Sequence, residues 1–436
     1  MNKIIIENFR CFHSKQEIPL TPITFLVGEN STGKTSFLAA VKVALDSIKG
    51  DVNFNQEPFN LGAYDQIANY RGGRGGRAKE FFIGSTFKIT NQQRLLKNKY
   101  DFENIKNLDI SINTKFSQKG TQPKIVEQKI NIGDIFSIAQ FYKEQPFKNS
   151  IIKSKIDNEE IPIPLDFPSD SAFLPLNTVL YIPKIFVSEN AGKQYDKLTF
   201  FYELLHDTLA PLNYFAISPI RTKPERTYDP QTETPQPEGA HIPMILAQLS
   251  GGEKTGWNNL KEKLIKFGSS AGLFKNLKVQ RKGTKESDPF QILVKIFGSE
   301  TNLIDVGYGV SQALPILVDS LKLQPNQLFL LQQPEVHLHP RAQAELGSFF
   351  GMLAKEENKK FIIETHSDYL IDRIRIDVRN KKYGLTSDDV TILYFDWDKT
   401  GVKIYPIKID SQGNILDAPK NYRNFFIKEE ENFFGI

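Results

Sequence analysis

The segment from Gly28 to Thr35 constrains the fold of this chain more than any other feature. It follows the pattern G-x-x-x-x-G-K-T and lies between a short apolar run, 23–27, and an amphipathic stretch, 36–48. A glycine-rich turn between a buried strand and a helix is the context that a phosphate-binding loop requires. The sequence therefore predicts a P-loop near the start of an α/β protein.

Each residue type in this loop has a chemical reason. The glycines let backbone N–H groups turn toward phosphate oxygens, and the following helix adds the positive end of its dipole. We expect Lys34 to reach the β- and γ-phosphates of ATP, and the Thr35 hydroxyl to bind Mg²⁺. The residues predicted to hold the nucleotide in this loop are Gly28, Asn30, Ser31, Thr32, Gly33, Lys34 and Thr35.

Composition excludes several classes of protein. The 436 residues include one cysteine, Cys11, so neither a disulfide framework within the chain nor a cysteine-ligated zinc site is expected. No apolar run approaches the ~18 residues of a membrane helix, and residues 1–12 carry charges that a signal peptide would lack. We therefore expect a soluble, cytoplasmic protein without membrane contact.

Regular alternation of strand-like and helix-like segments is concentrated near the two ends of the chain. The C-terminal part predicts strands over 291–297, 328–331 and 360–364, and helices from Ser311 onward, over 341–355 and over 368–375. Between 50 and 215 the pattern is irregular. We predict one ATPase head built from an N-terminal part, 1–50, and a C-terminal part, 216–436, with an inserted β-rich and helical region over 51–215.

The net charge of +4 combines a basic segment with an acidic remainder. Residues 71–155 hold 17 basic and 7 acidic side chains, a local excess of +10 that the remaining chain offsets with −6. Such a segment is either a polyanion-binding surface or a solvated insertion. Arg71, Arg74 and Arg77 are separated by glycines, so they are candidates for contact with a DNA backbone, and a flexible surface loop is the alternative.

The apolar strand 328–331 leads into Gln332 and Gln333. A P-loop ATPase needs one carboxylate here beside Mg²⁺ and a second that positions the attacking water. An amide is a neutral ligand that cannot take a proton from water, so we expect slow hydrolysis with nucleotide binding preserved. Gln332 is the predicted metal-side residue. Glu335, in the following turn, is acidic and could be recruited, but we do not assign it this role.

Three further segments supply candidate residues. The strand 361–364 ends in Thr-His-Ser, so His366 fits a switch histidine whose imidazole contacts the γ-phosphate. His337 and His339 suggest a metal by their spacing, although we favour a turn-forming role beside a proline. Arg221 and Arg226 either approach the nucleotide or a partner subunit, or form structural ion pairs.

Two segments resemble the signature sequence of ABC-type ATPases, which opens the helix before the acidic strand. Ser250 lies 82 residues before Gln332, whereas Ser311 lies 21 residues before it. Only the second spacing leaves room for a single helix, a turn and a strand. We therefore predict that Ser311 contacts the γ-phosphate bound by the other subunit, and we interpret Ser250 as part of a loop.

Together these segments resemble the ABC-type ATPases related to RecF, SMC and OLD (overcoming-lysogenization-defect) proteins. The resemblance rests on residues 6–12, the P-loop, the run 334–340 and the Thr-His-Ser at 365–367. The segments 215–226, 305–315 and 389–436 more narrowly resemble small stand-alone members of the AAA15/DUF3696 type. The resemblance covers roughly half of the chain and leaves the middle unplaced.

The resemblance implies a head-to-tail homodimer, or a higher oligomer, with two ATP molecules sandwiched between subunits. It also implies work in DNA-linked antiphage defence beside a separate effector protein, for which a nuclease is one option. Relatives usually carry Glu-Glu-Pro-Glu or Glu-Gln-Pro-Glu where this chain begins with Gln332. A glutamine there is either a natural loss or a Glu→Gln substitution made to trap the ATP state.

Three alternatives remain at this point. An OLD-like ATPase-nuclease is one, because Asp396-Trp397-Asp398 imitates the Asp-x-Asp of a Toprim domain, but only 70 residues follow His366. A RecF-like DNA repair or recombination ATPase is the second. The third is a nucleotide-binding scaffold that does not hydrolyse ATP, so that ATP only sets the state of assembly.

Overall fold

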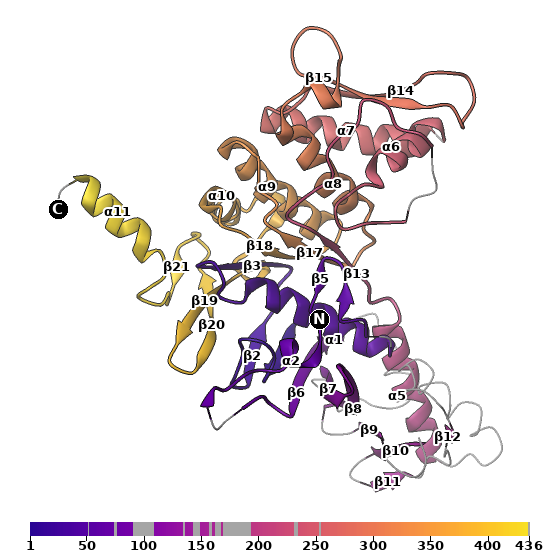
Figure 1. The fold of residues 1–436 in the computed structure, drawn as a ribbon, viewed down its shortest axis with the longest axis vertical. Coiled ribbons are helices and arrows are strands. Elements are labelled where there is room, and N and C mark those ends of the chain that lie inside the picture. The colour runs from indigo at the N-terminus through magenta and orange to yellow at the C-terminus, as the bar shows by residue number, and fades with distance from the viewer. Residues whose placement is uncertain are drawn as a thin grey trace. The chain divides into compact units, whose positions relative to one another are not determined.

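The computed structural model describes residues 1–50, 52–73, 76–89, 109–133, 136–142, 149–156, 159–161, 167–168, 193–230, 234–252 and 254–434. The chain divides into two compact units. The first comprises 1–20, 29–213 and 395–404, and the second comprises 21–28, 214–394 and 405–436. Helices and strands occur in both units, which confirms the predicted α/β class (Figure 1).

The first unit contains an antiparallel sheet in the order β11-β10-β9-β8-β7-β6-β1-β2, with β12 paired to β10. Its strands are β1 (Lys3–Glu7), β2 (Gln16–Pro19), β6 (Glu80–Lys88), β7 (Asp109–Lys119), β8 (Gln122–Ile132), β9 (Phe136–Tyr142), β10 (Asn149–Ile156), β11 (Glu159–Ile161) and β12 (Phe167–Pro168). In β7, every second side chain is buried, as expected for a sheet with one face covered. Lys3 of β1 pairs with Thr86 of β6, so the N-terminal strand and the region over 51–215 share one sheet.

Helix α1 (Lys34–Lys49) follows the P-loop and packs on this sheet. Its Phe37 is fully buried, with its ring 5.6 Å from that of Phe395. At the other end of the helix, Gln128 of β8 donates a 2.8 Å hydrogen bond to the Ser47 carbonyl. Packing and hydrogen bonding therefore hold the P-loop helix at both ends. The unit also contains α2 (Tyr64–Ile67), α5 (Lys193–Leu209) and the short pair β4 (Asn55–Gln56) and β5 (Phe59–Asn60).

A sheet in the order β13-β17-β18-β3-β19-β20-β21 lies in the second unit, except for residues 395–404, which belong to the first. Its strands are β3 (Ile23–Gly28), β13 (Tyr214–Ile217), β17 (Leu328–Gln332), β18 (Lys360–Glu364), β19 (Val390–Asp398), β20 (Gly401–Ile409) and β21 (Ile415–Leu416). The first four strands in this order run parallel. All five residues of β17 are buried, which explains its continuous apolar run, because a parallel strand is covered on both faces.

Helices make up much of the second unit, and the last of them extends away from the sheet (Figure 1). They are α6 (Ile242–Gly251), α7 (Lys254–Ala271), α8 (Tyr308–Lys322), α9 (Pro340–Glu356), α10 (Asp368–Arg379) and α11 (Asn424–Phe434). A small antiparallel sheet joins β14 (Asn276–Arg281), β15 (Phe290–Lys295) and β16 (Thr301–Asn302). The strands and helices predicted beyond residue 290 are confirmed, although α8 begins three residues before Ser311.

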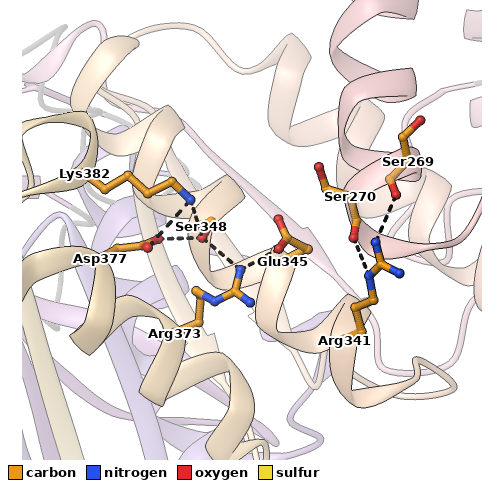
Figure 2. Close-up of polar contacts among 8 residues, drawn as sticks. All are labelled: Ser269, Ser270, Arg341, Glu345, Ser348, Arg373, Asp377 and Lys382. Atoms are coloured by element: carbon orange, nitrogen blue, oxygen red, sulfur yellow. Dashed lines mark hydrogen bonds and ion pairs between the residues drawn. The ribbon is translucent and has the colours of Figure 1, made fainter. Parts of the chain in front are cut away.

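Polar contacts tie α9 to its neighbours (Figure 2). Arg341 donates from Nε to the Ser270 carbonyl at the end of α7, over 2.7 Å. Arg373 of α10 forms a 2.5 Å ion pair with Glu345 of α9. The buried Ser348 hydroxyl donates to the Asp377 carboxylate over 2.6 Å. These contacts fix α7, α9 and α10 as one packed layer.

The interpretation of Ser250 as part of a loop was wrong, because Ser250 lies in the last turn of α6. Its hydroxyl donates to the carbonyl of Ala247, within the same helix. The following helix, α7, was also not predicted. Its Leu260, Leu264 and Phe267 recur at helical spacing and are buried, so the periodicity was present in the sequence.

The structure also bears on the membrane question. Among the described residues, no helix combines the length and the apolar character that crossing a bilayer requires.

Candidate functional site

The P-loop begins at the carboxyl end of β3 and leads into α1, as the motif predicts. Gly28, Ser31 and Gly33 have positive φ angles of 146°, 62° and 89°, which produce the tight curl of the loop. A Cβ on Gly33 would lie 2.4 Å from the Cys11 Sγ, so only glycine fits this position. Close packing beneath the loop therefore enforces the second motif glycine.

Lys34 lies back over its own loop. Its ammonium donates a 2.6 Å hydrogen bond to the Glu29 carbonyl, which also accepts from the Thr32 hydroxyl at 2.8 Å. The Lys34 side chain is 3% exposed, whereas Asn30, Ser31 and Thr35 are exposed. The curled backbone, the Lys34 ammonium over the loop and the exposed Thr35 hydroxyl match the arrangement of a phosphate-binding loop.

Cys11 is not a reactive thiol in this position. Burial raises the pKa of its thiol to about 11. A hydrogen bond with the backbone of Cys11 itself and the positive charge of Arg10 lower this pKa, but only in part. A thiol with such a raised pKa is protonated at neutral pH and a poor nucleophile. Cys11 therefore acts by filling the space beneath Gly33.

The other predicted site residues of the second unit lie near the carboxyl ends of its parallel strands. Gln332 ends β17 and pairs in register with Glu364, the last residue of β18. The next strand in the sheet, β3, ends at Gly28, where the P-loop starts. Gln332 is buried, and within the described part of the chain its Nε2 has no hydrogen-bond partner.

Gln333 and His366 follow the ends of these strands. Gln333 has a φ of 43°, and its backbone N–H donates to the Glu364 carbonyl over 2.8 Å. His366 is exposed, and its backbone N–H donates to the Glu335 carboxylate over 2.7 Å. Gln332, Gln333 and His366 therefore lie at or just beyond the carboxyl ends of two neighbouring parallel strands.

The first turn of α8 holds Ser311. The helix begins at Tyr308 after the N-cap residue Gly307, and Ser311 is its fourth residue. The Ser311 hydroxyl donates to the Tyr308 carbonyl over 3.0 Å, and the side chain is buried. The Tyr308 side chain, by contrast, is 54% exposed. The contact of Ser311 with the nucleotide of a second subunit remains a prediction.

The two arginines in the segment after β13 have different roles. Arg226 forms a two-pronged ion pair with Asp305, with distances of 2.8 and 2.6 Å, on the exposed surface. This contact is the structural alternative for Arg226. Arg221 instead is buried beside Gln333 and Glu335, and the sequence carried no signal for that placement.

His337 and His339 have structural roles in the turn before α9. The Nδ1 of His339 accepts a hydrogen bond from the Arg341 N–H, which caps the start of α9. His337 has a φ of 66°, and its ring lies 5.9 Å from that of Tyr308. Across the described residues, no group of three or more His, Cys, Asp or Glu side chains is arranged to hold a metal ion.

Two of the three predicted DNA-contact arginines, Arg71 and Arg77, have partners in the first unit. Arg71 donates to the Asn8 side chain over 2.7 Å. Arg77 donates to the Ala68 carbonyl over 2.8 Å and stacks 5.1 Å above the Tyr70 ring. Arg74 lies outside the described residues. DNA contact through these side chains stays a prediction.

Two family models match consecutive parts of the chain. The model described as "AAA domain" covers residues 3–206, which include the P-loop. The model described as "AAA ATPase domain" covers residues 221–371, which include Ser311, Gln332 and His366. The chain is thus a P-loop ATPase with an AAA15-type domain over residues 221–371. These matches confirm the predicted resemblance to AAA15-type ATPases.

Solved structures similar to this AAA15-type ATPase include SMC head domains. An Smc head bound to the C-winged helix domain of ScpA is 10% identical, with 93% of this chain and 97% of that one aligned at a TM-score of 0.48. A Pyrococcus furiosus Smc head with an extended coiled coil, bound to the C-terminal domain of ScpA, is 11% identical, with 99% of each chain aligned and a TM-score of 0.45. The Thermotoga maritima SMC head is 10% identical, with 94% and 99% aligned and a TM-score of 0.42. No curated protein matches the sequence.

An AAA15-type ATPase uses a nucleotide and, as a rule, Mg²⁺. The donors predicted for the metal are the Thr35 hydroxyl and the Gln332 amide oxygen, which are both neutral. The Gln332 Nε2 is buried without a hydrogen-bond partner among the described residues, so they do not hold that end of the amide. Neutral oxygen donors of this kind suit Mg²⁺ where phosphate oxygens supply the negative charge, since Mg²⁺ in such sites is bound partly by the substrate. When bound, the ion would neutralise charge on the phosphates.

Proposed function

We propose that this AAA15-type ATPase binds ATP with Mg²⁺ and acts as a dimeric sensor or scaffold in DNA-linked antiphage defence. Its output would come from a separate effector protein, for which a nuclease is one option. The supporting observation is that the P-loop motif is complete, whereas Gln332 and Gln333 stand at and after the end of β17, where two acidic residues are expected. Such a site suits binding better than turnover.

The chemistry follows from the residues. Lys34 would contact the β- and γ-phosphates, while Thr35 and Gln332 would hold the metal side of the nucleotide. Gln333 can orient a water molecule through its amide, but it cannot accept the proton that the water loses during attack on the γ-phosphorus. His366 would donate to the γ-phosphate. We therefore propose that ATP binding sets the assembly state and that hydrolysis is slow.

Dimerisation tests this proposal. We expect Ser311→Arg to abolish ATP-dependent dimer formation, because a bulky cation would replace a small side chain where the partner's γ-phosphate should dock. Light scattering with and without Mg·ATP measures the change, and circular dichroism checks that the variant is folded. An intact ATP-dependent dimer would contradict the assignment of Ser311 and make Ser250 the candidate.

Direct DNA contact is a separate part of the proposal. The basic excess over 71–155 supports it, because lysines and arginines that neutralise phosphates release counterions. We expect DNA affinity to fall steeply with salt, by about 10-fold or more between 50 and 200 mM, which a fluorescence-anisotropy titration measures. Absence of binding at low salt would contradict this part alone and leave the ATPase proposal standing.

Intrinsic nuclease activity finds no support at Asp398. Its carboxylate accepts hydrogen bonds from the Thr400 N–H and hydroxyl, at 2.7 and 2.6 Å, in the turn between β19 and β20. These bonds lower the pKa of Asp398 and explain the residue as a turn former. The effector is therefore proposed as a second protein.

A further inference from the structure

A buried cation and a buried anion lie directly behind the candidate catalytic residues. Arg221, in the segment between β13 and α6, is 4% exposed, and Glu335, in the turn between β17 and α9, is 8% exposed. Burying a charge is costly unless hydrogen bonds or an opposite charge compensate it. Their contacts therefore indicate what these two residues do.

Arg221 connects two segments through backbone carbonyls. Its Nη2 donates to the Gln333 carbonyl over 3.0 Å, and its Nη1 donates to the Gln312 carbonyl in α8 over 3.4 Å. Its Nε is buried and has no hydrogen-bond partner among the described residues. The guanidinium thus links the residue after β17 to the helix that begins next to the predicted signature serine.

Glu335 connects the same turn to the switch histidine. Its Oε1 accepts the His366 N–H over 2.7 Å, while its Oε2 is buried without a hydrogen-bond partner in the part of the chain that the structure describes. Burial raises the pKa of Glu335 and lowers that of Arg221 to about 10. The charge of each residue partly offsets the shift of the other, so the two act on one another electrostatically.

We propose that Arg221 and Glu335 form a positioning pair that holds Gln333, His366 and the start of α8 in one arrangement. The inference rests on the proposed function and deepens it. All three attachments are to backbone atoms, so the pair sets the positions of these segments whatever their side chains do. Loss of the pair should therefore slow the chemical step more than it weakens nucleotide binding.

A kinetic experiment tests the positioning role. The chain and its Gln332→Glu variant are each combined with Arg221→Met, with Glu335→Gln and with both changes, and phosphate release is followed under saturating Mg·ATP. We expect kcat to fall by about 100-fold in the single variants, because displacement of a catalytic segment by ~1 Å has an effect of that size. KM and the ATP Kd should stay within about 3-fold, since neither residue belongs to the P-loop.

A matched control is available in the same unit. Arg373 and Glu345 also form an Arg–Glu pair, at 2.5 Å, but they join α9 to α10 (Figure 2). Arg373→Met with Glu345→Gln should leave kcat within about 2-fold of the parent, because this half-buried pair joins α9 to α10 and bonds to none of the residues proposed to act on the nucleotide. Arg221→Lys keeps the positive charge but loses the planar guanidinium that bonds to two carbonyls. It should therefore recover only part of the kcat that Arg221→Met loses.

A thermal-unfolding cycle tests the pairing without nucleotide. Each single change leaves one buried charge uncompensated, so Tm should fall in Arg221→Met and in Glu335→Gln, and the double variant should recover most of that loss. Additive Tm losses, or an unchanged kcat in the single variants, would overturn the proposal. If the parent binds no ATP, the proposed function fails, and the Tm cycle still decides whether the two residues act as a pair.

Discussion

Lys34→Ala should abolish measurable ATP binding by this ATPase. Lys34 is the cation of the P-loop, and its ammonium already lies against the Glu29 carbonyl, at the base of the loop where phosphates are expected. Removing it takes away a charge-assisted contact to phosphate that water cannot replace. We expect a loss of at least about 100-fold in affinity, or about 2.7 kcal/mol, in isothermal titration calorimetry.

A control for Lys34→Ala lies on the same helix. Lys49 is an exposed lysine in the last turn of α1, bonded to the Asn213 side chain over 3.2 Å. Lys49→Ala changes the net charge of the chain by the same amount at the opposite end of the helix, so ATP affinity should stay within about 2-fold. Unchanged ATP affinity in Lys34→Ala would refute nucleotide binding at the P-loop. Loss of binding in both variants would point to net charge instead.

Gln332→Glu should raise phosphate release by at least about tenfold, because it restores a negatively charged metal ligand at the end of β17. The new carboxylate would be buried, with Glu364 beside it in register on β18. Two neighbouring carboxylates repel each other, so we expect a lower Tm without Mg²⁺ and recovery of Tm when Mg·ATP is added. Phosphate release and thermal unfolding measure the two effects.

A control for Gln332→Glu places a carboxylate at the other edge of the sheet. Gln327 precedes β17, and its Oε1 accepts from the Gln324 N–H over 2.9 Å, a bond that a glutamate can keep. Gln327→Glu should leave the rate of phosphate release unchanged. Equal rates in the parent and in Gln332→Glu would show that Gln332 does not limit turnover.

Local patterns were sufficient for much of the site. The P-loop is a contiguous motif, and β17 and β18 are short apolar runs whose ends carry Gln332 and His366. The sequence placed Gln332, Gln333 and His366 directly after these strands, and the parallel pairing of the two strands in the structure brings their ends together. The same local physics was available for α7, whose periodic leucines went unrecognised among lysines and glycines.

Other features lay beyond sequence patterns. Arg221 is 114 residues from Glu335, and neither stands in a motif that predicts a buried charge. The alternative of a structural ion pair held for Arg226 with Asp305 but not for Arg221, although both lie in one proline-rich segment. Burial, which separates them, depends on contacts with segments far along the chain.

The sequence by itself determined that the chain carries a P-loop before a helix and that the strand expected to end in acids ends in Gln332 and Gln333. Periodicity and motif spacing report interactions within a few residues, so they suffice for such features. The tertiary structure alone decided that Lys34 rests on the Glu29 carbonyl, that Cys11 fills the space under Gly33, and that Arg221 and Glu335 lie behind the sheet edge. Close packing and the cost of burying charge act between distant segments, and only the folded chain brings those segments together.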